Sequence, residues 1–404
     1  MLPQAAFHNT RGRVMHSKCI PALDRRRFLQ GTAVAAMFAS LGRGAWAQGK
    51  DPLKIGVTMP LTGSQAGYGN DFDIGMRKAL ADLNDAGGVA GRPLELVVLD
   101  TQAEPALGIN AMNRLINVDK VPVILTAWSS VIKGQAPSAN REKVLLLNTG
   151  ANAPEIARLG DFVYSTFPLA DVDITALAKY TYDRLGKRKA AVLYINNDTG
   201  IDAAKIYKDV FEKAGGEVVA YEAYDPKATE FSGMLLKVRA ANPDMVHVHG
   251  LIADVPMVIA QMRQLGLQQR ISSYSAGYNQ KLIDQLGPAA EGFIVTSLAP
   301  GAADNPRVPG FLERWKKEQN RLPNGLPYIQ YQYDSVQLAA QLYKHVLENK
   351  QEPTGETMRE ALLAIKEFDS PMTGKTVIDG HRVRKPVFLL TVENGQFKPL
   401  AKLD

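Results

Sequence analysis

The sequence predicts an α/β protein of two lobes, each built on a parallel β-sheet with helices on both faces. Short apolar runs alternate from residue 53 onward with stretches of helical period, a pattern typical of βαβ units. Glycines stand just past several predicted helix ends, at Gly87-Gly88, Gly186 and Gly215-Gly216, where a left-handed residue is favoured. Nine such strands precede the last hundred residues, too many for one ordinary mononucleotide-type sheet. Two lobes therefore fit the chain better than one.

Taken in order, the strands are predicted from apolar runs and the helices from apolar residues three and four positions apart. The strands cover residues 53–59, 94–99, 121–126, 144–148, 190–195, 217–221, 245–249, 271–275 and 293–297, with a last one at 387–392. The helices cover residues 72–84, 106–119, 174–184, 203–214, 231–241, 255–264, 280–285, 311–319 and 331–348. The pattern pauses near 166–168 and again near 297–301, which predicts two joints. The first lobe is expected to hold residues 53–166 and 300–373, and the second 168–297 and 376–402.

The first 47 residues read as an export signal that is cleaved from the mature chain. A basic stretch, Arg25-Arg26-Arg27-Phe28-Leu29, precedes an apolar run of about eleven residues and the small-x-small site Ala45-Trp46-Ala47. The apolar run is too short to span a bilayer. The arginine pair followed by x-Phe-Leu resembles a twin-arginine signal, although Asp24 and Gln30 depart from the usual pattern. The alternative is a Sec signal with a basic start, and Met15 is an alternative first residue.

Charge and cysteine content narrow the class of protein. Seven of the 47 basic residues but only one of the 41 acidic ones lie in the first 47 positions, which leaves forty of each elsewhere. The formal charge of +6 therefore gives no reason to expect nucleic acid or an anionic membrane as a partner. The single cysteine, Cys19, lies upstream of the arginine pair. We expect a periplasmic chain that is soluble, not lipid-anchored, not inserted in the membrane and free of disulfides.

The motifs of enzymes are incomplete in this chain. Gly67-Tyr68-Gly69 lacks the third glycine of a dinucleotide loop, and Gly374-Lys375-Thr376 lacks the first glycine of a P-loop. Ser130 and Lys133 match one β-lactamase motif, but its Ser-Asp-Asn partner does not occur. His247 and His249 share a strand face without obvious metal-binding partners, so no metal or other cofactor is predicted. We expect a binding protein and not an enzyme.

Several short blocks stand in order along the chain. They are Lys54-Ile55-Gly56-Val57 with Pro60-Leu61-Thr62-Gly63 and Tyr68-Gly69; Leu83-Asn84-Asp85-Ala86-Gly87-Gly88; Val98-Leu99-Asp100-Thr101; Thr149-Gly150-Ala151-Asn152-Ala153-Pro154-Glu155; Ala290-Glu291-Gly292; and Tyr333-Asp334-Ser335. As an ordered set they resemble branched-chain amino-acid-type periplasmic solute-binding proteins. The resemblance implies the type I periplasmic-binding-protein fold, with two Rossmann-like lobes joined by three hinge crossovers. It implies a receptor that delivers a small-molecule solute to an inner-membrane ABC permease. We expect a monomer.

The same resemblance implies a ligand site in the cleft at the carboxyl ends of the strands. The family holds the ligand's carboxylate and amine with residues after the third and fourth strands, and an aromatic residue covers the ligand side chain. The candidate residues in the first lobe are Tyr68, Ser129, Ser130, Thr149, Gly150, Ala151 and Asn152. The candidates in the second lobe are Thr199, His249, Leu251, Ala276 and Tyr278. For Ser129 the alternative is a helix N-cap, for Tyr68 a core or surface position, and for His249 and Tyr278 a structural role.

The second-lobe positions depart from the family in a way that affects the ligand. Thr199 stands where amino-acid binders often have Tyr, Ala276 where they have an acid for the ligand's ammonium group, and Leu251 replaces another aromatic residue. A buried cation without a partner is costly. The ligand is therefore either a small amino-acid-like carboxylate or an aromatic acid, another organic acid or an amide. A periplasmic sensing module for a signalling receptor is a further alternative to transport.

Overall fold

The computed structural model describes residues 51–251, 253–301 and 304–403, and within these ranges the chain forms two main sheets. The expected export signal, residues 1–47, lies outside the described residues. The first sheet has the strand order β2-β1-β3-β4-β5 and is parallel throughout. Its strands are β1 (Leu53–Met59), β2 (Leu94–Asp100), β3 (Val123–Thr126), β4 (Leu145–Asn148) and β5 (Val163–Ser165).

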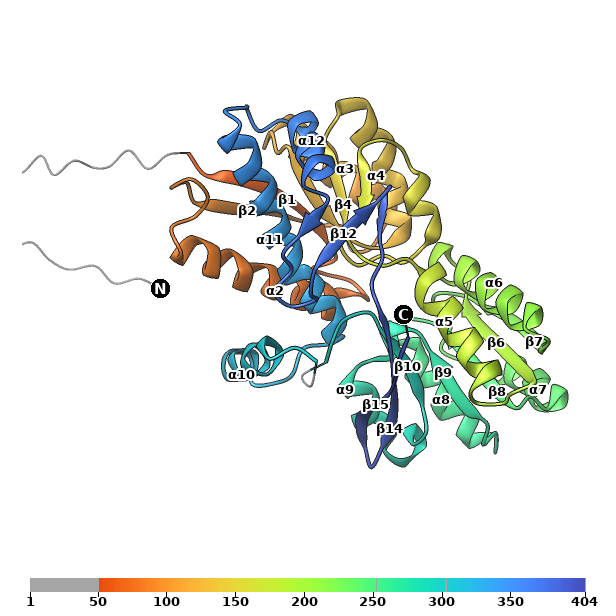
Figure 1. The fold of residues 1–404 in the computed structure, drawn as a ribbon. Helices are drawn as coiled ribbons and strands as arrows, with labels where there is room; N and C mark the ends of the chain where they lie inside the picture. The colour runs from red at the N-terminus through yellow and green to blue at the C-terminus, as the bar shows by residue number, and fades with distance from the viewer. Residues whose placement is uncertain (1–50, 252, 302–303, 404) are drawn as a thin grey trace, which may run out of the picture. The chain divides into compact units, whose positions relative to one another are not determined.

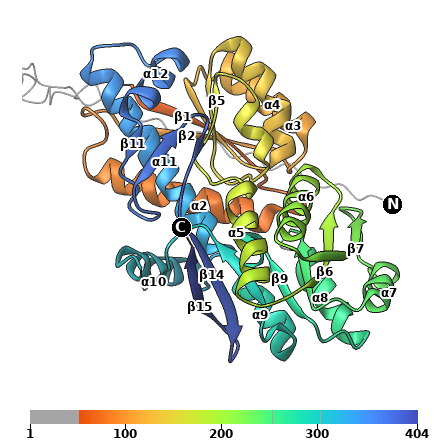
Figure 2. The same ribbon diagram turned by 45° about the vertical axis from the view of Figure 1, so that its right-hand side comes forward.

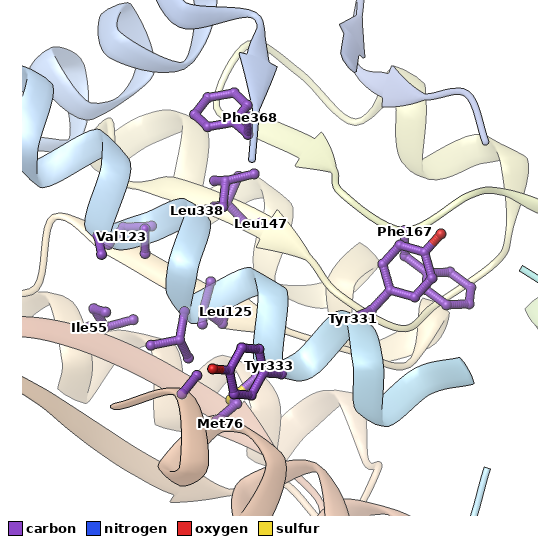
Figure 3. Packing of buried hydrophobic residues seen from close by; sticks show 14 of the residues in the cluster. Ile55, Met76, Val123, Leu125, Leu147, Phe167, Tyr331, Tyr333, Leu338 and Phe368 are labelled. Atoms are coloured by element: carbon purple, nitrogen blue, oxygen red, sulfur yellow. The ribbon is translucent and has the colours of Figure 1, made fainter. Parts of the chain in front are cut away.

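Alternate residues of this sheet enter two separate cores, one on each face. Val123 and Leu125 point to the core shared with α2 (Ala66–Asp85) and α11 (Leu326–Glu348). Figure 3 shows this core with both side chains labelled. Ile124 enters the opposite core, formed with α3 (Pro105–Asn117) and α4 (Ser129–Glu142). Strands buried on both faces read as continuous apolar runs, which is why the sequence pattern located them.

The second sheet has the order β15-β14-β10-β9-β8-β6-β7. Its neighbouring strands pair in parallel, except that β14 is antiparallel to both β10 and β15. Its strands are β6 (Lys189–Ile195), β7 (Glu217–Tyr224), β8 (Met245–His249), β9 (Arg270–Ser273), β10 (Ile294–Ser297), β14 (Val387–Glu393) and β15 (Gln396–Leu403). One face packs on α5 (Ala170–Asp183) and α6 (Asp198–Lys213), and the other on α7 (Ser232–Ala241), α8 (Asp254–Gln264) and α9 (Gln280–Leu286). Figures 1 and 2 both show the β14–β15 hairpin, from the end of the chain, beside β10.

The chain passes three times between the two sheets: after β5, after β10 and after β13 (Arg382–Val383). After β10 it forms α10 (Arg307–Gln319), α11 and α12 (Gly355–Ile365), and then a small sheet of β11 (Glu367–Phe368), β12 (Thr376–Asp379) and β13. This small sheet lies against β5, where the Ser165 amide donates to the His381 carbonyl at 2.9 Å. Short 3₁₀ turns complete the described elements at Pro154–Arg158, Ser275–Gly277 and Gly287–Ala290.

Every predicted strand and helix has a counterpart among these elements. Helices α4 and α12 and strands β5, β11–β13 and β15 are absent from the predicted ranges. The lobe boundary at residue 376 stays a prediction. Ile378 and Val383 are buried in the core of the first sheet, whereas Arg382 pairs with Asp171 of α5, which packs on the second sheet.

Candidate functional site

Loops from both sheets enclose one cavity with about 430 Å³ of space between atoms, part of it open to solvent. We call it the interlobe cavity. Its walls come from segments that follow β1, β3, β4, β6, β8 and β9, together with the first turn of α11. The carboxyl ends of parallel strands are where α/β sheets place ligands. The lining residues are Gln65, Tyr68, Phe72, Trp128, Ser129, Gly150, Ala151, Asn152, Thr199, Leu251, Tyr274, Ala276 and Tyr328.

Tyr68 is placed by the close approach of α2 to the end of β1. A Cβ on Gly69 would overlap the backbone carbonyl of Pro60, so only glycine allows this first turn of the helix to pack there. Asp100 fixes the intervening loop, because its carboxylate accepts a hydrogen bond from the Leu61 amide at 2.8 Å. The Tyr68 ring is then buried against Phe72, with ring centroids 5.8 Å apart.

Ser129 is the first residue of α4 and lines the cavity, and it does not cap the helix. The residue at the N-cap is Trp128, which makes no side-chain capping bond. Trp128 has φ 69°, a left-handed conformation that is costly for a bulky residue and is found where the surrounding structure imposes it. The strained backbone directs the indole ring toward Phe72, 5.5 Å away between centroids, and leaves the Ser129 hydroxyl at the cavity wall.

The loop after β4 contributes differently from what the sequence suggests. The Asn148 side-chain oxygen accepts hydrogen bonds from the backbone amides of Gly150 and Ala151, at 3.1 and 2.7 Å. These amides are therefore already used and do not face a ligand. The Thr149 hydroxyl donates to Gln332 at 2.8 Å and points away from the cavity. Asn152 lines the cavity instead, and its buried side-chain NH₂ finds no acceptor among the described residues.

On the side of the second sheet, Thr199 and Ala276 contact residues of the first lobe that line the cavity. Asn197 caps α6 by accepting from the Gly200 amide at 3.0 Å, which places Thr199 in the first turn of that helix. The Thr199 hydroxyl reaches that of Ser129 at 3.3 Å. The Tyr68 hydroxyl donates to the Ala276 carbonyl at 2.9 Å. These contacts join the two sheets on separate sides of the cavity.

Two further contacts link the lobes. The hydroxyls of Tyr328 and Ser275 are 2.9 Å apart. Lys133 on α4 contacts Asp198 on α6 at 3.1 Å and Glu155 at 2.7 Å, outside the cavity lining. With the contacts of Tyr68 and Ser129, they hold the described lobes together around the cavity.

His249 and His247 lie in the core of the second lobe and outside the cavity lining. His249 stacks on Tyr274, with centroids 3.9 Å apart, and Tyr274 itself is the residue that lines the cavity. His247 stacks on Tyr207 at 4.3 Å. Burial lowers the pKa of both imidazoles, so they stay neutral. Neither ring nitrogen of His249 has a hydrogen-bond partner within the described part of the chain.

Of the other expected site residues, Ser130 and Tyr278 are also outside the lining. Ser130 follows Ser129 on the helix and is turned away from the cavity wall. Tyr278 packs edge-on against Phe397, with centroids 4.8 Å apart, on another part of the second lobe. Tyr68, Ser129, Gly150, Ala151, Asn152, Thr199, Leu251 and Ala276 are the expected residues that the structure brings together.

The residues that the sequence did not suggest are mostly aromatic. They are Gln65, Phe72, Trp128, Tyr274 and Tyr328. Trp128 stands next to the expected Ser129, so the sequence itself could have indicated that Trp128 lies at the site. Tyr328 belongs to the N-terminal turn of α11 and not to a strand end, so the strand pattern carries no signal for it. Its ring stacks on Phe167 at 5.0 Å and reaches the cavity from the side of the first crossover.

The cavity lining is neutral and largely aromatic. None of the lining residues given above is acidic or basic. Burial raises the pKa of the Tyr68, Tyr274 and Tyr328 phenols, so they remain hydrogen-bond donors at neutral pH. A buried acid, Asp254, lies next to this region at the start of α8, but it accepts a hydrogen bond from Tyr224 at 2.6 Å and does not line the cavity.

Comparison with known proteins identifies the family. A family model described as periplasmic binding protein matches residues 52–396. This chain belongs to the periplasmic binding proteins. A relative in Pseudomonas aeruginosa PAO1, the leucine-, isoleucine-, valine-, threonine-, and alanine-binding protein, is 26% identical over 345 residues, which is 85% of this chain and 90% of that one. The resemblance to the branched-chain amino-acid type is therefore confirmed.

Solved structures of periplasmic binding proteins share the fold. The leucine-binding protein LivK of Thermotoga maritima MSB8 has a TM-score of 0.78 at 25% identity, covering 87% of this chain and 99% of that one. A solute-binding protein of an ABC transporter from Rhodopseudomonas palustris BisB5, solved with 3,4-dihydroxybenzoic acid, has a TM-score of 0.77 at 23% identity, covering 88% and 97%. The expected type I fold, two Rossmann-like lobes with three crossovers, is confirmed. The Pseudomonas and Thermotoga proteins are named as binding proteins, and the Rhodopseudomonas protein as a solute-binding protein of an ABC transporter.

Membrane-spanning helices and metal-binding clusters are both absent from the described residues. No helix in residues 51–251, 253–301 or 304–403 is both long and apolar enough to cross a bilayer. The same ranges hold no cluster of three or more His, Cys, Asp or Glu side chains arranged to bind a metal.

Proposed function

We propose that this periplasmic binding protein captures a small aromatic carboxylate in the periplasm and delivers it to an inner-membrane ABC permease. The observation that carries the proposal is the combination of five aromatic rings with a lining that has no charged side chain. Ligand sites are typically apolar with a few well-placed polar groups, which is the character of this lining.

Polar groups from both lobes are available for the carboxylate. The Ser129 hydroxyl accepts from the Thr199 hydroxyl at 3.3 Å, so its own proton remains for a ligand. The NH₂ of Asn152, which has no acceptor among the described residues, belongs to the lining of the same cavity. Ser129 and Thr199 also stand in the first turns of α4 and α6, whose N-terminal ends favour negative charge. Each hydrogen bond to a carboxylate contributes about 1.5–3 kcal/mol. The aromatic body of the ligand would pack against Phe72, Trp128 and the tyrosine rings.

The lining argues against an ammonium group on the ligand. Ala276 occupies the position where the resemblance predicts an acid, and Asp254 is already hydrogen-bonded to Tyr224. A buried ammonium without a carboxylate partner would cost several kcal/mol. The second candidate is a branched-chain amino acid, which the name of the Pseudomonas relative favours.

Isothermal calorimetry with benzoate, benzamide and leucine separates these candidates. We expect benzoate to bind, benzamide to bind at least about tenfold more weakly because it lacks the charge, and leucine to give no heat. Ser129→Ala should weaken benzoate binding by about ten- to hundredfold. Ser130→Ala is the matched control, since that neighbour is outside the lining and should change nothing. Tight leucine binding with no response to benzoate would overturn the proposal.

A further inference from the structure

A second hollow adjoins the interlobe cavity and shares part of its wall. We call it the outer groove. It has about 1160 Å³ of space between atoms, much of it open to solvent, and runs between the first turn of α2 and the helices α8 and α9. Gln65 and Tyr68 line both hollows. The groove and the proposed ligand site therefore meet at these two side chains.

Tyr68 is the larger of the two side chains between the hollows. Its side chain is 5% exposed, and its hydroxyl bonds across to the Ala276 carbonyl of the other lobe at 2.9 Å. The ring is confined by Tyr328, 5.8 Å away between centroids, and by Gly325, where a Cβ would overlap it. These contacts come from the second lobe, through Ala276, and from the start of α11, through Gly325 and Tyr328, so the ring is held on two sides.

The chemistry of the outer groove fits an uncharged apolar chain. Pro256, Met257 and Ala260 of α8 and Leu282 of α9 form an apolar wall, and its lining includes the amides of Asn279 and Asn324. The only ionisable side chain in the lining, apart from the Tyr68 phenol, is Lys281, which is exposed. An alkyl or alkoxy chain would lose water on entering, and each methylene buried there is worth roughly fourfold in affinity.

We propose that Tyr68 sets the length of the ligand that this protein accepts, and that the outer groove is a latent subsite for an alkyl or alkoxy substituent on the aromatic acid. The proposal rests on the proposed function, because the carboxylate and ring occupy the interlobe cavity. In the unaltered protein the partition excludes such substituents. A smaller residue at position 68 joins the two hollows and lets the substituent extend along α8.

The test compares benzoate with its 3-butoxy and 4-butoxy derivatives by calorimetry. The unaltered protein should bind benzoate and reject both derivatives. Tyr68→Leu, which keeps an apolar side chain, should bind at least one butoxybenzoate about tenfold or more tightly than the unaltered protein does. Adding Ala260→Trp to fill the groove should abolish this gain and leave benzoate binding unchanged. Gln264→Trp, on an exposed part of α8 outside the groove, is the matched control and should leave the gain intact.

Two results would overturn the assignment of Tyr68. One is a Tyr68→Leu protein that binds benzoate but gains nothing for either derivative, and the other is a gain that survives Ala260→Trp. Failure of benzoate to bind to any variant would instead count against the proposed function. A crystal structure of Tyr68→Leu tests the role of Tyr68 as a partition without any binding measurement. The two hollows must form one continuous space in that structure, and a wall supplied by another residue refutes the inference.

Discussion

Replacing Lys133 by Met should weaken ligand binding by removing an ion pair that joins the two lobes. The Lys133 ammonium lies 3.1 Å from Asp198 on α6 and 2.7 Å from Glu155. The hydrogen bond to Glu155, and next the one to Asp198, raise the pKa of Lys133. Methionine keeps most of the aliphatic stem and removes only the charge. The pair contributes to binding only if it forms as the lobes close on the ligand.

The size of the effect follows from the exposure of the pair. The side chains of Lys133 and Asp198 are 30% and 38% exposed, so solvent screens their attraction. Pairs of this kind contribute about 0.2–1 kcal/mol. The dissociation constant should therefore rise by roughly 1.4- to 5-fold in Lys133→Met.

Calorimetry at low and high salt tests the electrostatic origin of this effect. The difference between the unaltered protein and Lys133→Met should be present at about 20 mM NaCl and vanish at about 500 mM, where the screening length is only a few ångströms. Lys205→Met is the control, because Lys205 pairs with Asp209 within α6 and does not join the lobes. A difference that persists at high salt, or an equal loss in the control, would refute the reasoning.

Three further predictions concern pH, the ligand's charge and export. Burial raises the pKa of Asp173 to about 7, so the folded protein keeps a proton that the unfolded chain releases. The free energy of unfolding should fall as the pH rises from about 4 to 7 and then level off, and denaturant titrations should show a smaller fall for Asp173→Asn. Ala276→Glu should weaken benzoate binding, because it buries a negative charge in the cavity. Improved binding in calorimetry would contradict the argument that the ligand needs a neutral lining at this position. Arg25→Lys together with Arg26→Lys should keep the precursor in the cytoplasm. An unchanged periplasmic yield on fractionation would favour a Sec signal.

The strands were predictable because burial on both faces leaves continuous apolar runs, and the elements that escaped prediction lack such a signal. The helix α4 contains Gly134 and Pro137 and few apolar residues, so it depends on packing against α3 and not on its own propensity. The edge strand β15 contains Pro399 opposite an irregularity in β14, a position where proline is tolerated. Neither α4 nor β15 could be predicted from the local periodicity of apolar residues.

The candidate site was predictable where a side chain follows a strand end and not where tertiary contacts bring it in. Ser129 and Asn152 follow β3 and β4, which are neighbours in the first sheet, so sheet topology places these two residues together. Thr199 follows β6 of the second sheet and joins them only where the two lobes meet. Tyr328 comes from α11, far along the chain, and only the packing of that helix against α2 brings it to the cavity. His249 was expected in the cleft, but it occupies the core behind Tyr274.

The nested order of the chain constrains how the protein folds. The first sheet is complete at Ser165, but α11, which covers one of its faces, is made only after all of β6–β10. The second sheet in turn lacks β14 and β15 until the very end. The core shared with α11 and both cores of the second sheet therefore stay incomplete until late in synthesis, and such pairing of distant segments slows folding. A chain that stops before Val387 would leave β10 as an open edge, free to pair with a strand of another molecule.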